Sequence, residues 1–160
     1  MIRITKDLAE KIEKHGTETY PDECCGILLG SSDGETHLVK DIAELENNQV
    51  ENRQRRFLVT PEQYLQAERT ASERGMELLG FYHSHPDHPA IPSEFDREHA
   101  LPWFIYIVMS VVGGRPTVMT AWILSDSRDR FLERHMSVEI PEDDDPSGRR
   151  GRPDIADRIF

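Results

Sequence analysis

Two histidines and an aspartate stand at a spacing that suits a bound metal ion. His83 and His85 are separated by one residue in the segment ELLGFYHSH, whose composition predicts a β-strand. Side chains two positions apart in a strand project from the same face, about 6.6 Å apart along the chain. Both imidazoles can therefore converge on one ion. A catalytic zinc ion takes three protein ligands and leaves its fourth position to water, and Asp96 is the expected third ligand.

The segment between His85 and Asp96 supports this interpretation. Its three prolines predict an extended loop, and Ser93 is a suitable N-cap for a short helix. Asp96 then falls in the first helical turn, where the helix dipole favours a carboxylate. The loop can return this turn over the end of the strand. His88 is a rival ligand, although its place beside prolines favours a histidine on a surface loop.

A metal-dependent hydrolase also needs a base, because a proton must leave the attacking water and reach the leaving group. Glu23 is the candidate, since it directly precedes the apolar run CCGILLG, where a carboxylate is an unusual choice. The alternative is a surface carboxylate before a strand. Cys24 and Cys25 raise the question of thiol chemistry, but adjacent cysteines in an apolar run favour buried packing, and neighbours do not easily form a disulfide.

Several segments predict the elements that position these residues. Thr5 predicts the cap of a helix that ends near Gly16, and Thr60 with Gln63 predicts a capping box for a helix that ends at Gly75. Apolar runs predict strands at residues 24–30, 36–45, 57–59, 77–85, 103–112 and 118–124. The second is expected to be an antiparallel partner of the first, and the last is expected to be a hairpin partner or a near neighbour of the strand before it. The fold class is α/β, with a mixed, largely antiparallel central sheet flanked by two to three helices.

Length and composition narrow the possible classes of protein. A chain of 160 residues fits one domain, expected at residues 1–140, followed by a disordered tail at 141–160 that is rich in Pro, Gly and charge. No apolar window reaches a membrane span and no secretory signal is present, so a cytoplasmic location is expected. The net charge of −11 argues against a nucleic-acid partner. The composition of the polar loop 46–56, with Arg53, Arg55 and Arg56, favours a solvated loop, and the alternative is contact with an acidic patch on a protein substrate.

Two segments resemble the JAMM, or MPN-plus, metalloprotease family: PDECCGILLG at residues 21–30 and GFYHSHPDHPAIPSEFD at residues 80–96. They contain the family's Glu, its His-x-His-Pro and its Ser-x-x-Asp, and the resemblance extends over roughly residues 1–125. It implies the cytidine-deaminase-like MPN fold and one zinc ion per chain.

By matching position, the resemblance implies that His83, His85 and Asp96 bind zinc, that Glu23 is the general acid and base, and that Ser93 stabilises the oxyanion. It also implies a peptidase that cleaves after the C-terminal Gly-Gly of a ubiquitin-like β-grasp protein or a sulfur carrier. Two alternatives stay open: a non-catalytic interaction domain of the same fold, and a zinc hydrolase of a small-molecule amide.

Overall fold

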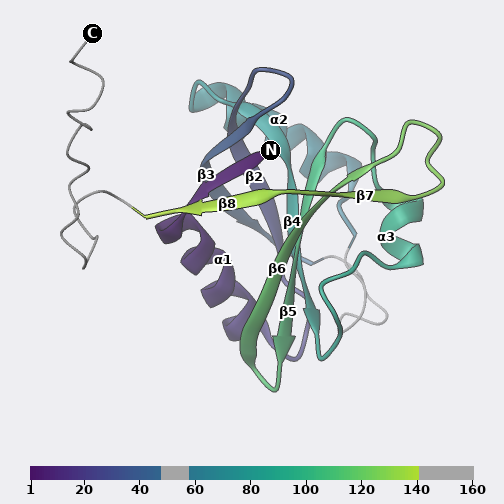
Figure 1. The fold of residues 1–160 in the computed structure, drawn as a ribbon. Helices are drawn as coiled ribbons and strands as arrows, with labels where there is room; N and C mark the ends of the chain where they lie inside the picture. Colours follow the sequence, from purple (N-terminus) through teal and green to yellow (C-terminus); the bar gives the residue numbers. More distant parts are fainter. Residues whose placement is uncertain (48–57, 141–160) are drawn as a thin grey trace, which may run out of the picture.

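The expected α/β arrangement is present as one mixed sheet with helices against both faces (Figure 1). The computed structural model describes residues 1–47 and 58–140. Its elements are, in chain order, β1 (Ile2–Thr5), α1 (Lys6–Thr19), β2 (Cys25–Ser32), β3 (His37–Leu45), α2 (Pro61–Glu73), β4 (Glu77–Pro86), α3 (Glu94–His99), β5 (Ile105–Val112), β6 (Arg115–Leu124), β7 (Phe131–Arg134) and β8 (Met136–Glu139).

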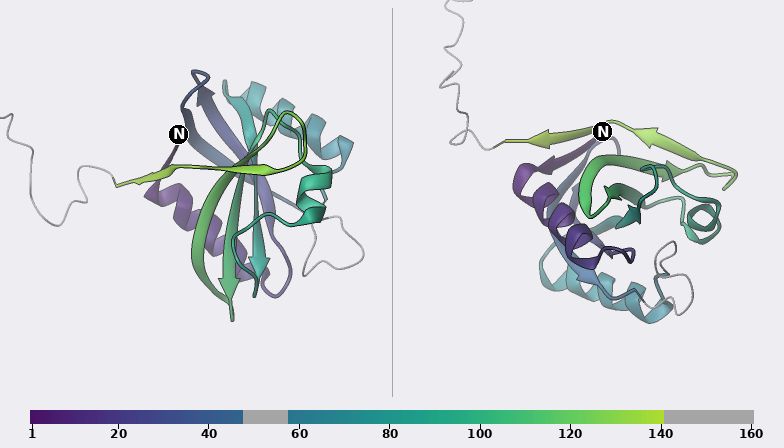
Figure 2. Two further views of the ribbon diagram at one scale, coloured as in Figure 1. Left: turned by 45° about the vertical axis from the view of Figure 1, so that its right-hand side comes forward. Right: turned by 90° about the horizontal axis from the view of Figure 1, so that it is seen from below.

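The strands of the described residues follow the order β7-β6-β5-β4-β2-β3-β1-β8 across the sheet. Neighbouring strands are antiparallel except for the parallel pairs β4–β5, β1–β3 and β1–β8. β7 and β8 lie at opposite ends of this order, although only His135 separates them in the sequence. Together they form a nearly continuous band that connects the two ends of the sheet (Figure 2).

Buried apolar side chains form one cluster on each face of the sheet, and β4 contributes to both. Tyr82 belongs to the cluster that receives side chains from α1, and Phe81 belongs to the cluster that receives side chains from α2. Because successive side chains of a strand alternate between faces, His83 and His85 lie on the same face as Phe81. The sequence pattern of β4 thus directs both imidazoles towards the side of the sheet that carries α2.

The N-caps predicted at Thr5, Thr60 and Ser93 are confirmed, but the predicted end of the first helix is wrong. Thr60 accepts a hydrogen bond from the Gln63 backbone N–H, and the Gln63 side chain accepts one from the Thr60 N–H. Thr5 accepts from the backbone N–H of Leu8 at the start of α1. This helix continues past Gly16, where a Cβ atom would lie 2.3 Å from Met109 Cε. The glycine therefore permits close packing of α1 on β5 and does not end the helix.

Most of the predicted strands are present, with differences at their edges. β2 pairs antiparallel with β3, and β5 pairs antiparallel with β6, as the sequence predicts. The prediction of a strand at residues 57–59 is wrong for residues 58 and 59, which precede α2 without regular structure. β5 begins at Ile105, and Trp103 before it is 69% exposed, so this residue is not part of the core. β1, β7 and β8 were not assigned from the sequence.

Two expectations fall wholly or mainly on residues that lie outside the described ranges. They are the disordered tail at 141–160 and the loop 46–56, of which residues 46 and 47 alone are described. In the described part of the chain, no helix is both long and apolar enough to cross a lipid bilayer.

Candidate metal centre

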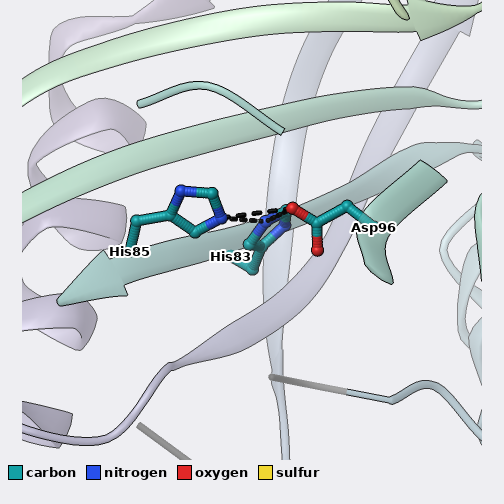
Figure 3. Close-up of side chains that lie close together, drawn as sticks. All are labelled: His83, His85 and Asp96. Atoms are coloured by element: carbon teal, nitrogen blue, oxygen red, sulfur yellow. Dashed lines mark hydrogen bonds and ion pairs between the residues drawn. The ribbon is translucent and has the colours of Figure 1, made fainter. Parts of the chain in front are cut away.

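His83, His85 and Asp96 meet at the end of β4, where their side chains point towards one another (Figure 3). The Nε2 atoms of the two imidazoles are 3.1 Å apart. Asp96 Oδ2 lies 3.2 Å from each of these nitrogens. All three side chains are more than nine-tenths buried. Three atoms that can each donate a lone pair are therefore held within hydrogen-bond distance of one another, in a site largely closed to solvent.

The spacing of these three atoms fits a tetrahedral metal ion. Zinc binds imidazole nitrogen and carboxylate oxygen at about 2.0 to 2.2 Å, so the ligand atoms of a tetrahedral site are separated by roughly 3.3 to 3.6 Å. The three observed separations, 3.1, 3.2 and 3.2 Å, are close to the lower end of this range. Two imidazoles and one carboxylate also form a ligand set that zinc accepts in hydrolases. The residues present therefore fit a zinc ion in both chemistry and spacing.

The His85 ring is oriented by a contact outside the group. Its Nδ1 lies 2.9 Å from the backbone carbonyl oxygen of Pro89, an atom that only accepts hydrogen bonds. Nδ1 must therefore carry the proton, which leaves the lone pair of Nε2 directed at His83 and Asp96. A hydrogen bond of this kind on the second nitrogen is the usual way in which a protein fixes a metal-binding histidine.

Asp96 is held by the capping box of α3. The Ser93 hydroxyl accepts a hydrogen bond from the Asp96 backbone N–H at 3.1 Å, and the Ser93 N–H donates to Asp96 Oδ2 at 2.8 Å. Burial alone disfavours the carboxylate form of Asp96, but the adjacent His83 and His85 outweigh it and hold the pKa of Asp96 well below its usual range. Burial has the opposite consequence for His83, whose pKa it lowers. Ionised Asp96 and a neutral His83 are the forms that can bind a metal ion.

Glu23 is buried beside this group, with only 2% of its surface exposed. The segment that carries it is tied to β4 by Ser84, the residue between the two histidines. The Cys24 N–H donates to the Ser84 hydroxyl at 2.8 Å, and the Ser84 N–H donates to the Cys24 carbonyl at 3.1 Å. Asn47 donates from its side-chain amide to the Glu23 carbonyl at 3.3 Å. These bonds place the Glu23 backbone at a fixed position relative to the β4 histidines.

The Glu23 carboxyl group is in an environment that disfavours its charge. Burial, followed by the nearby charge of Asp96, raises the pKa of Glu23 to about 9. Among the described residues, Oε2 of this side chain has no hydrogen-bond partner. A buried carboxyl with a raised pKa and a free oxygen next to a cleft is typical of a group that transfers protons.

Two cavities adjoin the candidate ligands. A cleft of about 320 Å³ is lined by Glu23, His85, His88, Pro89, Ile91 and Ser93. A smaller cavity of about 80 Å³ adjoins His83 and Asp96 on the side of Phe81 and Tyr106, and its remaining lining is mainly aromatic and aliphatic. The carboxyl of Glu23 and the hydroxyl of Ser93 thus border the same cleft as the candidate ligand His85. A molecule in this cleft would contact both groups.

The structure brings together all five residues that the sequence singled out, and the rival candidates are not among the three grouped ligand atoms. His88 lines the cleft but is not part of the group of three ligand atoms. Cys24 and Cys25 are buried free thiols, and burial raises their pKa values to about 11 and about 12. Because thiolate is the reactive form of cysteine, these two residues are suited to packing and not to nucleophilic catalysis.

Two groups that hold the site in place were not predicted from the sequence: the Pro89 carbonyl, which bonds His85, and the Ser84 hydroxyl, which bonds Cys24. The first is a backbone atom, which no residue type reveals. The second had a weak signal, because a polar side chain between two buried histidines needs a hydrogen-bond partner of its own.

Comparison with known proteins shows the family of this chain. Residues 5–125 match the family Prok-JAB, described as prokaryotic homologs of the JAB domain. The chain is 32% identical over 149 residues to a desampylase from Haloferax volcanii, which covers 86% of this chain and 96% of that protein. It is 33% identical over 118 residues to a desampylase from Pyrococcus furiosus, which covers 73% of this chain and 76% of the relative.

A solved structure shares the fold. A JAB1/MPN domain protein from Archaeoglobus fulgidus superposes with a TM-score of 0.52 at 18% sequence identity, covering 89% of this chain and 98% of that one. This likeness confirms the MPN-type fold that the sequence resemblance implies. Since the family match covers most of the sequence and includes every residue of the candidate centre, the chain belongs to the prokaryotic JAB family.

Proposed function

We propose that this chain is a zinc metallopeptidase that hydrolyses the bond after a C-terminal Gly-Gly of a ubiquitin-like or sulfur-carrier protein. The observation that carries the proposal is the convergence of His83, His85 and Asp96 within 3.2 Å of one another, beside a cleft that also contains Glu23. Membership of the JAB family and the similarity to two desampylases support the proposal of a peptidase that acts on a ubiquitin-like protein.

In this proposal His83 Nε2, His85 Nε2 and Asp96 Oδ2 hold one zinc ion. When bound, zinc supplies Lewis-acid chemistry: it polarises a carbonyl group and lowers the pKa of water towards about 7. The contribution of the chain is to hold neutral imidazoles and an ionised carboxylate in place. The Pro89 carbonyl fixes the ring of His85, and Ser93 fixes the carboxylate of Asp96.

Glu23 moves the proton. As a carboxylate it accepts a proton from the water that attacks the scissile carbonyl, and as a carboxylic acid it donates that proton to the leaving amine. Its high pKa makes it a good proton acceptor once it is ionised, and a nearby divalent cation favours ionisation because it offsets the charge of Asp96. Burial keeps bulk water away from the carboxyl, so the proton stays on Glu23 between the two transfers.

Ser93 binds the developing negative charge on the scissile carbonyl. Its Oγ already accepts a hydrogen bond from the Asp96 N–H, so its own proton is available to donate into the cleft that it lines. A hydroxyl that caps a helix and also donates to an oxyanion serves both roles without a change of position.

The size and lining of the cleft suit a short peptide segment with small side chains. Its lining has one large exposed aliphatic side chain, Ile91, which is 62% exposed, and no lysine or arginine among the described residues. A volume of about 320 Å³ accommodates a short stretch of small residues on either side of a scissile bond, as a tail that ends in glycines provides. The desampylase relatives make a ubiquitin-like protein the preferred source of such a tail.

The test is a cleavage assay on zinc-loaded full-length protein. The substrate is a β-grasp protein whose C-terminal Gly-Gly is extended by one amino acid, and mass spectrometry measures the loss of that residue. We expect release by the wild type and none by Glu23→Gln. A short amide with the same scissile bond is run in parallel. Equal turnover of the short amide and the β-grasp protein would contradict a protein substrate, and no turnover of either would contradict the peptidase assignment.

A further inference from the structure

Three consecutive backbone carbonyls beside the candidate metal centre are each bound by a side chain. The Ser110 hydroxyl of β5 donates to the His88 carbonyl at 2.6 Å. His85 Nδ1 bonds the Pro89 carbonyl at 2.9 Å. The Thr120 hydroxyl of β6 donates to the next carbonyl, that of Ala90, at 2.6 Å. We call residues 88–90 the strap, because they connect the end of β4 to the loop before α3.

The outer two bonds restrict the middle carbonyl. Rotation of either peptide plane next to the Pro89 carbonyl would break the bond from Ser110 or the bond from Thr120. Ser110 is 4% exposed and Ala90 is 5% exposed, so water does not readily replace either lost bond. The backbone N–H of Ile91 adds a second donor to the Pro89 carbonyl at 2.8 Å. The strap is therefore held to the sheet in one orientation, which directs this carbonyl at the imidazole of His85.

A tryptophan sets the direction of the threonine hydroxyl. Trp122 Nε1, which can only donate, lies 2.8 Å from Thr120 Oγ1. Thr120 Oγ1 therefore accepts from the indole and has its own proton left to donate. Two carbonyls are within reach of that proton, Ala90 at 2.6 Å and Val108 at 3.4 Å, and the much shorter separation favours Ala90.

We propose that Ser110 and Thr120, the latter oriented by Trp122, are positioning residues for the metal ligand His85. They act through the strap, and neither contacts His85. Loss of their hydroxyls frees the Pro89 carbonyl to turn away, which deprives His85 Nδ1 of its acceptor. The ring can then rotate, or carry its proton on Nε2, and in that tautomer Nε2 has no lone pair for a metal ion. The inference rests on the metal site of the proposed function and not on its substrate.

The test uses variants that remove or keep the hydroxyls. Thr120→Val and Ser110→Ala delete them, singly and together, and Thr120→Ser keeps the hydroxyl on a smaller side chain. Thr70→Val is the matched control, because the Thr70 hydroxyl also donates to a backbone carbonyl, that of Gln66 in α2 at 2.9 Å. Unfolding of the metal-free proteins is measured for each variant, so that a loss of folding is separated from a loss of positioning.

The first measurement is zinc affinity, by competition with a chromogenic chelator. Loss of a partner around a metal ligand typically lowers affinity by about 10- to 100-fold. We expect about tenfold for Thr120→Val, more for the double variant, and values close to wild type for Thr120→Ser and Thr70→Val. Unchanged affinity in the double variant, or an equal loss in Thr120→Ser and Thr120→Val, would overturn the inference. Neither result would affect the proposed peptidase activity.

The second measurement needs no metal. Nitrogen-15 NMR of the histidine rings reports which ring nitrogen carries the proton. In the metal-free wild type we expect His85 to be protonated at Nδ1, and in the double variant we expect a mixture of the two tautomers. A wild-type His85 protonated at Nε2, or a tautomer that does not respond to loss of both hydroxyls, would contradict the inference even if zinc binding failed for other reasons.

Discussion

Replacement of Glu23 by glutamine should make the metal-free protein more stable at neutral pH while it abolishes peptide hydrolysis. The wild-type carboxyl is 2% exposed, and its burial and the adjacent Asp96 raise its pKa from the ordinary value of 4.5 to about 9. Between these two values the unfolded chain has lost the proton that the folded chain keeps. The unfolded state therefore binds fewer protons, and the free energy of unfolding falls as the pH rises.

The size of the effect follows from the shift. Each pH unit between the two pKa values lowers the free energy of unfolding by about 1.4 kcal/mol, so the penalty at pH 7 is about 3 kcal/mol. Glutamine has no proton to lose and carries no such penalty. The free energy of unfolding of Glu23→Gln should therefore exceed that of the wild type by an amount that increases by about 2.5 kcal/mol between about pH 5 and about pH 7. At low pH, where Glu23 is protonated in both the folded and the unfolded chain, the difference in free energy of unfolding between the variant and the wild type reports only the replacement of a carboxylic acid by an amide.

The assay is denaturant unfolding of chelator-treated protein over this pH range. Glu68→Gln, the same change at an exposed side chain of α2, is the control for the substitution itself. Zinc should reduce the pH dependence of the wild-type free energy of unfolding, because a nearby cation favours the carboxylate form of Glu23. If the difference in free energy of unfolding between Glu23→Gln and the wild type did not change with pH in the metal-free protein, the pKa of Glu23 would not be raised in the folded chain, because Glu23 would then ionise there as readily as in the unfolded chain.

Three further predictions concern the ligands and the scaffold. Asp96→Asn removes the anionic ligand and should weaken zinc binding by more than about a hundredfold in a chelator competition, and near-normal affinity would exclude Asp96 as a ligand. Thr60→Ala removes the hydroxyl that accepts from the Gln63 backbone N–H and should lower the free energy of unfolding by about 1 kcal/mol, whereas an unchanged midpoint of urea unfolding would contradict a stabilising role for this hydroxyl. Gly80→Ala places a Cβ 1.8 Å from the Ile105 carbonyl oxygen and should destabilise the fold by about 3 kcal/mol or more, which a melting temperature equal to wild type would contradict.

The candidate site could be predicted from the sequence to the extent that it depends on local structure. The strand of β4 places His83 and His85 on one face whatever the rest of the fold does. The cap at Ser93 places Asp96 in the first turn of α3, and the structure has that arrangement. Glu23 is different, because its place beside these residues depends on the pairing of β2 with β4. No local pattern shows that pairing, and the family resemblance implies only that Glu23 belongs to the site.

The fold was less predictable where contacts between distant segments decide the outcome. Gly16 has the local signal of a helix end, but its close packing against Met109 keeps it inside α1. β7 and β8 are short strands whose pairing with opposite ends of the sheet depends on the overall topology. Trp103 continues an apolar run in the sequence, yet the strand begins two residues later and leaves the indole 69% exposed. For Gly16, β7 and β8, contacts between distant segments override the pattern of neighbouring residues.

The metal centre is tested most directly by a crystal grown with zinc, with diffraction measured at the zinc absorption edge. We expect one anomalous peak per chain, within about 2.0 to 2.2 Å of His83 Nε2, His85 Nε2 and Asp96 Oδ2. A peak bound by Cys24 or Cys25, or no peak between the two imidazoles and the carboxylate, would contradict the claim that these three side chains hold the catalytic metal.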